Sequence, residues 1–528
     1  MKLDMRVRWL LTFLLCGFSV LKSAAQDCPV RPESGAVVND AYSIVSQNGV
    51  LSAKFIMEHS VDKFGYTHYC YKYNASGQTV EAPTLRVNPG DQLNLEVVNK
   101  IKEGDSKGNV KEIMPMPAAS GQTTCGDGGA MTLESTNVHF HGLNVPPICH
   151  QDDVIDTLIQ PGSPGFKYSM QIPPTEPPGL YWYHPHVHGF TEFQVNGGAA
   201  GAIVVEGMEK YRPEVAGLTE RVFVIRQQYL VPWIPGPYQL SINYQVAPSI
   251  GLKPIIQMKP NEKQFWRVAN ASIQDFLQLQ FLVHDKPRPM EMIALDGYPL
   301  AQTREQDTIL IPPAGRAEFI VQAPAAGGSA VFVTNAYSTG PTGNADVSQA
   351  VANIQVVSGS DDSQRTSKTV VPAPLNELKF SDLAQAQVTA QRKLFFSEEF
   401  GGTNGPIEFY ITVDGQKQKT FQPDEKPVIT TKVGAVEDWT IENRALETHA
   451  FHIHQIHFEV LEVDGKPAAN NDLRDTIEIP YWDGKGPFHS VKVRMDFRDP
   501  TIAGTFLFHC HILLHEDLGM MHKILVEP

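Results

Sequence analysis

The 528-residue chain has little positive charge, no long apolar run after its first 25 residues and little helical periodicity. Its 43 Lys and Arg residues are outnumbered by 58 Asp and Glu residues, so the net charge is −15. Nucleic acids and anionic membrane surfaces attract basic patches, so neither is expected as a partner. Without a later apolar run, we expect no stable membrane insertion. The length and the 42% of apolar residues fit a globular protein of several domains, which we expect to be a monomer.

Residues 1–25 have the pattern of a secretory signal peptide. A basic start with Lys2 and Arg6 precedes an apolar run over residues 9–21 and small residues suited to cleavage after Ala25. The run is too short to span a bilayer comfortably, which disfavours a membrane anchor. The sequence therefore predicts a secreted or periplasmic protein.

The chain contains only six cysteines, and removal of the signal peptide takes one of them away. Cys510 lies between two histidines. The other four form an even set in a protein expected to be exported, where disulfides persist: Cys28, Cys70, Cys125 and Cys149. We expect one or two disulfides, and the three possible pairings stay open.

One pattern, a turn followed by an alternating strand that ends in Asn, occurs three times. The copies span residues 87–99, 258–270 and 431–443, so their starts lie 171 and 173 residues apart. Short β-branched and aromatic stretches between Gly, Pro and Asn clusters recur throughout, which favours β-sandwiches. The pattern predicts three consecutive domains, at 26–210, 211–362 and 363–528. The stretch at 358–375, rich in Ser, Asp, Thr and Pro, predicts the linker into the third.

Five His-x-His pairs stand out among the 18 histidines, far more than random placement would give: 139/141, 184/186, 186/188, 452/454 and 509/511. On a strand, residues i and i+2 face the same side, so each pair directs two imidazoles into one site. A second repeat joins the first and third domains, because Gly179 precedes His184-Pro-His186 as Gly504 precedes His509-Cys-His511. The middle domain has only His284, so we expect it to separate and position the other two.

The C-terminal segment indicates which metal is bound. Cys510, His515 and Met520, with one further histidine, supply the two His, one Cys and weak axial Met of a blue-copper electron-transfer site, whereas zinc would not need the Met. We assign the further histidine to His449, which leaves the next His-x-His pair for a second centre.

Four ordered blocks resemble those of the multicopper oxidases, the family of laccases, bilirubin oxidases and bacterial copper-efflux oxidases. The blocks are His139-Phe-His141-Gly, Trp182-Tyr-His184-Pro-His186, His449-Ala-Phe-His452-Ile-His454 and His509-Cys510-His511. The tail from His511 to Met521 is most similar to the bacterial efflux and spore-coat type and to bilirubin oxidases. The resemblance covers the whole mature chain. It implies an all-β fold of three consecutive cupredoxin-like β-sandwich domains and an enzyme that couples one-electron oxidation of a donor to four-electron reduction of dioxygen to water.

The resemblance also implies four copper ions, one of type 1, one of type 2 and two of type 3. The implied ligands of the type 1 copper are His449, Cys510, His515 and Met520. His139 and His452 would bind the type 2 copper, and the type 3 pair would be held by His141, His184, His186, His454, His509 and His511. The first and third domains each donate two His-x-His pairs, so the trinuclear cluster must lie at their interface. Pro185 stands where the third domain has Cys510.

Reduction of dioxygen to water takes up four protons, so acidic side chains are expected near the cluster. Asp152 and Glu516 match acidic positions of the family and are predicted to relay protons, although each could instead be a surface carboxylate or a turn cap. His188 and His457 extend two clusters, but the ligand set is already complete, so we expect them to contact ligands or a channel. Asp475 matches a family position on the substrate side and could equally be a structural turn.

The electron donor is the least specified part of the function. Copper-efflux oxidases usually carry a Met-rich insertion over the type 1 site, and the third domain has none. This favours laccase-like oxidation of phenols and aromatic amines over oxidation of Cu(I) or other metal ions, with bilirubin as a further alternative donor. Two other classes are a copper storage or transport protein and a nitrite reductase, neither of which needs the full ligand set.

Two sequons for N-glycosylation, at Asn74 and Asn270, matter only in a eukaryotic secretory pathway.

Overall fold

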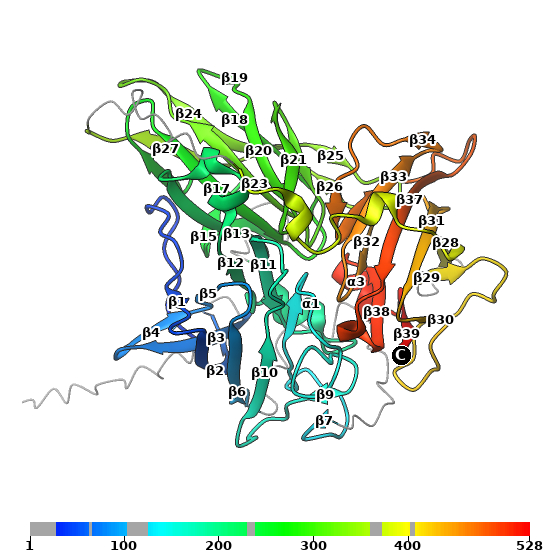
Figure 1. The fold of residues 1–528 in the computed structure, drawn as a ribbon. Helices are drawn as coiled ribbons and strands as arrows, with labels where there is room; N and C mark the ends of the chain where they lie inside the picture. The colour runs from blue at the N-terminus through cyan, green and yellow to red at the C-terminus, as the bar shows by residue number, and fades with distance from the viewer. Residues whose placement is uncertain (1–27, 63–65, 103–124, 230–237, 360–371, 402–406) are drawn as a thin grey trace, which may run out of the picture.

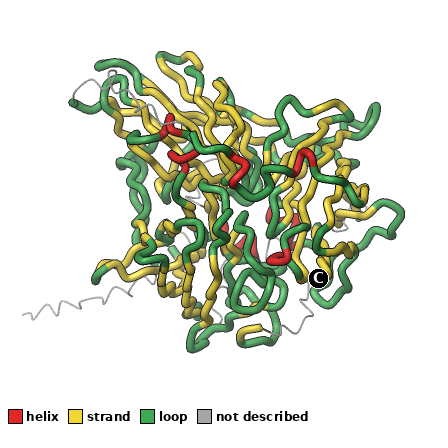
Figure 2. The backbone as a smooth tube through the Cα atoms, in the orientation of Figure 1, coloured by secondary structure: helices red, strands yellow, loops and turns green. Residues whose placement is uncertain are grey.

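The computed structural model describes residues 28–62, 66–102, 125–229, 238–359, 372–401 and 407–528. The predicted signal peptide and most of the predicted linker lie outside these ranges. The described residues form three β-sandwiches with a few short helices, so the predicted all-β class is confirmed (Figure 1, Figure 2).

The first sandwich packs two five-stranded sheets against each other. One sheet has the order β1 (Ser43–Val45), β5 (Thr84–Val87), β12 (Gly201–Val205), β11 (Gly179–His184) and β8 (His139–His141). The other has the order β10 (Phe166–Gln171), β6 (Gln92–Asn99), β2 (Val50–Val61), β3 (Thr67–Ala75) and β4 (Gln78–Glu81). A small pair, β7 (Cys125–Gly126) and β9 (Thr157–Leu158), and helix α1 (Thr191–Asn196) complete this part.

The second sandwich is the green part of Figure 1. Its seven-stranded sheet has the order β15 (Gln245–Ala247), β14 (Tyr238–Ile242), β13 (Thr219–Tyr229), β17 (Lys263–Ala271), β23 (Arg316–Gln322), β20 (Met290–Leu295) and β21 (Tyr298–Gln306). The facing sheet has the order β16 (Ile255–Met258), β27 (Gln349–Val356), β24 (Ala330–Asn335), β18 (Leu277–Val283) and β19 (Lys286–Pro287), with β22 (Ile309–Ile311) beside β18. A hairpin of β25 (Tyr337–Ser338) and β26 (Ala345–Asp346) extends from it, and α2 (Met208–Tyr211) precedes it.

The third sandwich is coloured from yellow to red in Figure 1. One sheet has the order β29 (Ile407–Val413), β28 (Ala390–Phe400), β31 (Ala435–Asn443), β37 (His489–Phe497), β33 (Phe458–Val463) and β34 (Lys466–Pro467), with β35 (Leu473–Arg474) beside β33. The other has the order β30 (Ile429–Lys432), β39 (Met521–Glu527), β38 (Gly504–Cys510), β32 (His449–Ile453) and β36 (Thr476–Ile479), and α3 (Leu513–Asp517) follows β38.

The three copies of the sequence repeat become β6, β17 and β31, and their final Asn residues explain why the repeat ends there. Asn99, Asn270 and Asn443 are at most 1% exposed. Each donates its side-chain amide to two backbone carbonyls and accepts, through Oδ1, the N–H two residues later. A buried amide that satisfies otherwise unpaired backbone groups fixes the loop after each strand.

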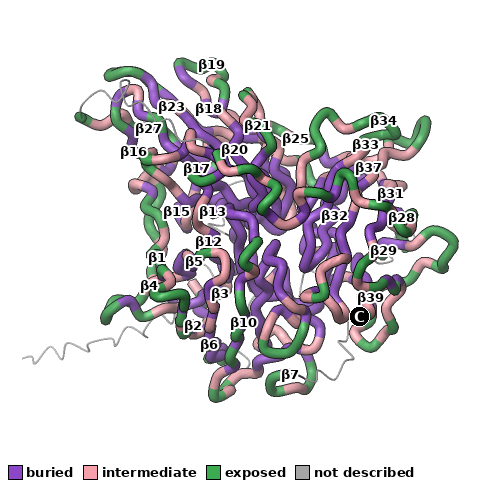
Figure 3. The backbone as a smooth tube through the Cα atoms, in the orientation of Figure 1, coloured by how far each residue is buried: buried purple, intermediate pink, exposed green. Residues whose placement is uncertain are grey.

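Alternation of apolar side chains builds the cores. In β18, Leu277, Leu279, Phe281 and Val283 point inward while the residues between them are partly exposed, which is the period of two expected for a strand with one buried face. Figure 3 shows buried backbone running through each sandwich and across their junction. The sheets of each sandwich come from one third of the chain, while the exact domain boundaries stay predictions.

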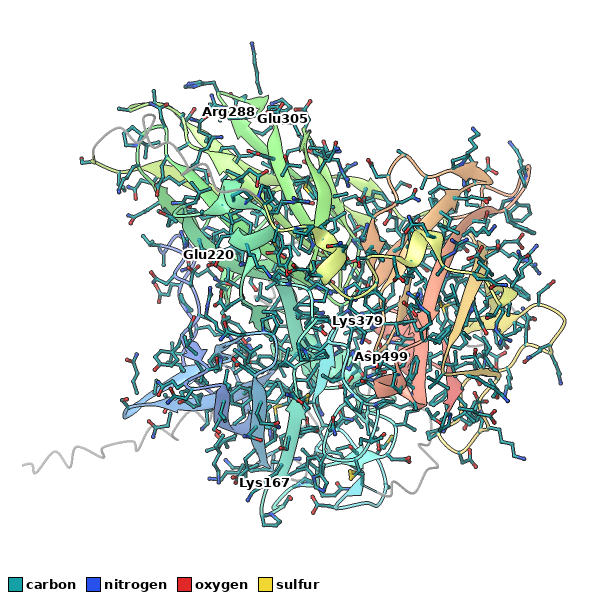
Figure 4. All side chains as sticks on the ribbon, viewed as in Figure 1. Lys167, Glu220, Arg288, Glu305, Lys379 and Asp499 are labelled. Atoms are coloured by element: carbon teal, nitrogen blue, oxygen red, sulfur yellow. A yellow bond between two sulfur atoms is a disulfide. The ribbon has the colours of Figure 1, made fainter. Side chains whose placement is uncertain are left out.

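Ion pairs and hydrogen bonds fix the sandwiches and the segment before β28 to one another. Glu220 on β13 accepts from both Arg86 on β5 and Arg267 on β17, which ties the first sandwich to the second. Lys379, from the segment before β28, pairs with Asp499 of the third at 2.7 Å (Figure 4). α1 and α3 lie next to each other, because Asp517 accepts the backbone N–H groups of Thr191 and Glu192.

The four cysteines outside the metal motif form two disulfides, Cys28–Cys70 and Cys125–Cys149, so the pairing that the sequence left open is resolved. Within the described residues, no helix has the length and apolar character needed to cross a membrane.

Candidate metal centres

Eight histidines meet where the first and third sandwiches face each other. They are supplied by β8 and β11 of the first and by β32 and β38 of the third, as four His-x-His pairs: His139/His141, His184/His186, His452/His454 and His509/His511. Strand register sets the first member of each pair opposite a partner, since His184 pairs with His139 and His509 pairs with His452. All eight are at most 2% exposed. The predicted interface position of the cluster therefore agrees with the geometry.

The cluster has an approximate two-fold arrangement that follows the repeat. The ring of His139 stacks on His454 with centroids 4.0 Å apart, and the ring of His141 stacks on His452 at 3.9 Å. Ring nitrogens of other histidines also face one another. His509 Nε2 lies 3.1 Å from His454 Nε2 and 3.5 Å from His186 Nε2. Ligand atoms of these residues form overlapping groups of three that could each hold a metal ion.

Backbone and carboxylate acceptors fix the ring orientation of four of these histidines. The Nδ1 atoms of His184 and His509 lie 2.8 and 3.0 Å from the carbonyl oxygens of the residues that follow them. His452 Nδ1 lies 2.9 Å from the Asp475 carbonyl oxygen, and His139 Nδ1 lies 3.0 Å from both oxygens of Asp152. Such acceptors fix the Nδ1–H tautomer and leave Nε2 as a ligand atom.

The donor set fits metal ions. Within the described residues, the Nε2 atoms of His139, His184 and His452 are buried without a hydrogen-bond partner. Buried polar atoms are normally paired, and lone pairs that face one another are stabilised by a cation between them. Burial lowers the pKa of these histidines, to about 3 for His184 and about 4 for His509. They are therefore neutral, which is the form that binds metals.

The two predicted proton-relay carboxylates both lie against the cluster. Asp152 is 2% exposed and accepts from the Phe140 backbone N–H at 2.9 Å and from Gln455 Nε2 at 2.6 Å, in addition to facing His139. Glu516 is fully buried, with its two oxygens 3.6 Å from His186 Nδ1 and 3.3 Å from His509 Nδ1. Burial raises the pKa of both carboxyl groups well above the usual range. The surface alternative is therefore wrong for both residues, while the relay role and the capping alternative stay untested.

A third carboxylate at the cluster links it to the middle sandwich. Asp475 Oδ1 lies 3.4 Å from His141 Nε2 and receives Nη1 of Arg316 at 2.7 Å, while Arg316 Nη2 binds Oδ2. Arg316 on β23 is fully buried, and it also donates to the Leu180 carbonyl of the first sandwich and to the Ala314 and Asp296 carbonyls of its own sandwich. Asp475 thus serves the histidine cluster, whereas the sequence suggested the substrate side or a turn.

The structure explains why the first histidine block ends in a glycine, Gly142. It has a φ of +90°, and a Cβ there would lie 2.5 Å from Arg316 Nη2 and 2.7 Å from Asp475 Oδ2. The Arg316–Asp475 contact therefore needs a residue without a side chain at this position. Sequence reasoning missed Arg316, because nothing in its surroundings marks a middle-domain arginine as part of the site.

The predicted type 1 ligands lie on the third sandwich beside the cluster. Cys510 Sγ lies 3.5 Å from His449 Nδ1 and 3.8 Å from His515 Nδ1, and the two Nδ1 atoms are 3.3 Å apart. These three atoms form a triangle of the size that one small ion can fill. Met520 is fully buried, and its backbone binds His515 and Cys510. The set therefore matches the two His, one Cys and Met of a blue-copper site.

The chemistry of the thiol also fits a metal. Cys510 is the free cysteine of the described chain and is fully buried. Burial raises the pKa of its thiol, so the thiolate would not form without a cation beside it. A bound metal ion is the ordinary means of stabilising such a thiolate.

Two carboxylates lie beside the predicted type 1 histidines, and no sequence pattern marks them. Glu398 Oε1 on β28 lies 3.5 Å from His449 Nε2, and Glu447 Oε2 lies 3.6 Å from His515 Nε2. The Phe409 ring stacks on the His515 ring at 4.0 Å, which leaves the His515 side chain 3% exposed.

Two further acids, Asp275 and Asp346 of the second sandwich, lie close to this pair. Burial and repulsion from Asp275 raise the pKa of Asp346 to about 9, and burial and repulsion from Glu398 raise that of Glu447 to about 8. Burial raises the pKa of Asp275 to about 6.

Comparison with known proteins agrees with this geometry. Three family models, each described as multicopper oxidase, match residues 131–210, 214–360 and 401–528 and together cover most of the chain. The chain belongs to the multicopper oxidase family. A multicopper oxidase of Staphylococcus haemolyticus is 23% identical over 504 residues, 89% of this chain and 91% of the relative. A Bacillus subtilis laccase is 23% identical over 426 residues, 74% of this chain and 79% of that protein.

The fold is shared with solved members of the family. A multicopper oxidase from Campylobacter jejuni described as a metallo-oxidase superposes with a TM-score of 0.67 over 94% of this chain and 96% of that one, at 23% identity. Its likeness shows three cupredoxin-like domains here and confirms the expected fold class.

Within this multicopper oxidase, the two extra histidines take different places. His457 donates Nε2–H to the Asp296 carbonyl oxygen at 2.7 Å and lies 3.9 Å from Asp475, while His188 lies against Phe421. Neither joins a ligand group among the described residues. The division of the eight histidines between type 2 and type 3 ions stays a prediction, because the groups of three overlap.

Proposed function

We propose that this protein is a copper-dependent oxidase that takes electrons from a donor at the His449, Cys510 and His515 site and uses them to reduce dioxygen to water at the eight-histidine cluster. The observation that supports this most strongly is strand β38. Cys510 belongs to the donor-side site, and its neighbour His509 belongs to a ligand group of the cluster. Its other neighbour, His511, joins none of these groups of three, but its ring lies 5.1 Å from that of His141 and 5.5 Å from that of His452 in the cluster. One tripeptide therefore connects the two sites covalently.

Bound copper, expected as one type 1, one type 2 and two type 3 ions, would supply the one-electron transfers and the four-electron chemistry of dioxygen. The protein's own residues exclude bulk water, since the eight histidines are buried at the domain interface. Asp152 and Glu516 lie within 3.6 Å of ring nitrogens of cluster histidines, which places carboxyl groups where protons are consumed. We propose them as the proton relay.

The carboxylates over the type 1 histidines favour a metal cation as the electron donor. Glu398 and Glu447 each face one of the two imidazole edges. Their repulsion, which raises the pKa of Glu447, would be relieved by a small cation that displaces the proton at this entry point of electrons. An aromatic ring has less room there, because Phe409 covers His515. Cu(I) or another reducing metal ion is therefore our first candidate. Laccase-like oxidation of phenols and aromatic amines, favoured by the absent Met-rich insertion, is the second, and bilirubin is a further donor to test.

Copper loading followed by initial rates under air tests these proposals. We expect four coppers per chain, a blue colour and oxygen consumption. Two or fewer coppers in a folded, loaded chain would contradict the site, and copper binding without oxygen consumption would indicate storage or transport. Turnover of nitrite without air would indicate a nitrite reductase.

Rates with Cu(I), a dimethoxyphenol and bilirubin rank the donors. In Glu398→Gln and Glu447→Gln we expect kcat/KM for Cu(I) to fall about tenfold, a loss of ~1.4 kcal/mol, with the phenol rate nearly unchanged. Glu399→Gln is the matched control, because Glu399 is the exposed neighbour of Glu398 on β28. Equal losses for both donors would remove the preference for metal ions.

We also propose that the protein functions outside the cytoplasm, secreted or periplasmic. The two disulfides support this, since such bonds persist in oxidising compartments.

A further inference from the structure

A cavity of about 430 Å³ lies between the second and third sandwiches, apart from both metal sites. Its walls come from the β21 segment Tyr298–Arg304, from the chain between Leu375 and Ala384, and from Glu459 with the segment 470–473. This volume is within the range of ordinary small-molecule sites. Three segments that are far apart in sequence thus build one pocket, and the metal chemistry described above does not use it.

The charged groups of the lining are already balanced. Arg304 donates Nη1 and Nη2 to the two oxygens of Asp472 at 3.0 and 2.6 Å. Glu459 is 4% exposed and receives the Asn471 amide at 2.8 Å, and burial raises the pKa of its carboxyl group. Arg304 and Asp472 already neutralise each other, and the buried carboxyl group of Glu459, with its raised pKa, is disposed to take a hydrogen-bonding partner. The lining therefore points to an uncharged ligand.

The remaining polar lining consists largely of carboxamides. Gln302, Asn376, Asn470 and Asn471 are all exposed, and each carboxamide both donates and accepts hydrogen bonds. Below them, Tyr298, Leu300 and Phe380 form an apolar floor that is at most 5% exposed. The pocket thus combines a rim of mixed donors and acceptors with a flat apolar base.

Besides Nε of Arg304, two lining side chains have buried polar atoms without a hydrogen-bond partner among the described residues, the hydroxyl of Tyr298 and Oε2 of Glu459. Leaving such groups unpaired costs ~1–3 kcal/mol each, so a native structure usually satisfies them with water or a ligand. A hydroxyl group suits both positions, because it can donate to the carboxylate and exchange a hydrogen bond with the phenol.

We propose that this pocket binds an uncharged polyhydroxylated ligand, a sugar of mono- or disaccharide size. Its hydroxyls would bind the carboxamide rim and Glu459, and its C–H face would pack on the apolar floor. Because the walls belong to two sandwiches and the segment between them, the bound sugar would also hold these parts together.

Isothermal titration of the copper-loaded full chain with glucose, cellobiose and maltose tests the proposal. Glycylglycine is the zwitterionic comparison. We expect saturable binding of at least one sugar and a higher Tm in its presence. Ala301→Trp fills the pocket from an exposed lining position and should weaken binding at least about tenfold. Ala326→Trp, at an exposed position outside the lining, is the matched control and should bind normally.

A second variant guards against misfolding of the first. Gln302→Ala removes one exposed carboxamide and should weaken sugar binding while the Tm without ligand stays unchanged. The proposal is overturned if no sugar binds saturably, if Ala301→Trp binds as well as the parent, or if glycylglycine binds more tightly than every sugar.

Discussion

Strands β11 and β38 occupy equivalent places in the first and third sandwiches, yet among these two only β38 adjoins the proposed type 1 site. Both begin at a glycine, both end in histidines of the cluster, and both fix the first histidine in the same way. His184 Nδ1 faces the Pro185 carbonyl oxygen and His509 Nδ1 faces the Cys510 carbonyl oxygen. The carbonyl of the middle residue therefore serves the cluster in both, and its side chain is free to differ.

The difference extends beyond this one residue. Counted from the matching histidines, the positions of His449, Cys510, His515 and Met520 correspond in the first sandwich to Thr136, Pro185, Phe190 and Val195. All four of these are buried. The first sandwich has thus filled the type 1 site with a packed, metal-free core, and its histidines serve the cluster alone.

Cys510→Ser removes the thiol that distinguishes β38 from β11. We expect this variant to lose more oxidase activity than any of the others. The variant should lose the blue colour and one copper per chain, and its oxidase rate should fall at least about a thousandfold, ~4 kcal/mol. Absorption spectra, copper analysis and oxygen uptake measure these changes. A variant that kept its blue colour would place the type 1 site elsewhere.

The next largest effect is expected on stability and copper retention, from a substitution in the middle sandwich. Arg316 connects this sandwich to the cluster. Arg316→Met leaves Asp475 buried without its partner, which should lower the free energy of unfolding by ~3–5 kcal/mol and reduce copper retention. Thermal unfolding and copper content measure both. Lys263→Met is the control, since Lys263 is 52% exposed and its pair with Glu291 is long at 3.9 Å. A normal Tm in Arg316→Met would mean that the middle sandwich acts only as a spacer.

The sequence could predict the parts of this site that depend on local spacing. Strand geometry turns His-x-His into two ligands on one face, so the histidine pairs pointed to a metal cluster before the structure. The type 1 set followed from the Cys, His and Met of one segment, and the choice of eight cluster histidines followed from the resemblance to the family. The repeat that ends in Asn likewise predicted three sandwiches, because a buried amide there has a local role.

The parts that depend on long-range packing could not be predicted. Arg316 meets Asp475 across 159 positions of sequence, and Glu398 meets His449 between the two sheets of the third sandwich. A single carboxylate or arginine has no periodic pattern that would reveal such a partner. Asp475 was misplaced toward the substrate side for the same reason, since its position depends on how the sandwiches pack.

Asp152 breaks the two-fold arrangement of the cluster. Its substitution is expected to reduce activity less than the loss of Cys510 does. His139 is held by this carboxylate, whereas its counterpart His452 is held by a backbone carbonyl. In Asp152→Asn we expect oxygen reduction to slow about 10–100-fold, the usual cost of losing such a partner of a ligand histidine, while anaerobic reduction of the blue centre by the donor stays nearly unchanged. Stopped-flow absorption separates the two steps, and an equal loss in both would argue against the assignment.

Pro185→Cys is expected to change least, and it tests the comparison from the other side. The substitution gives β11 the middle residue of β38, but Thr136, Phe190 and Val195 still stand where a type 1 copper needs two imidazoles and a thioether. The Pro185 carbonyl that faces His184 is kept by any residue at this position, so the cluster should retain its copper. We therefore expect an unchanged copper count and blue intensity, measured per chain by metal analysis and absorption. A second blue band would show that a thiol at position 185 is enough to form a type 1 site. It would also show that the buried residues around Pro185, which lack the other ligands, do not prevent copper binding there.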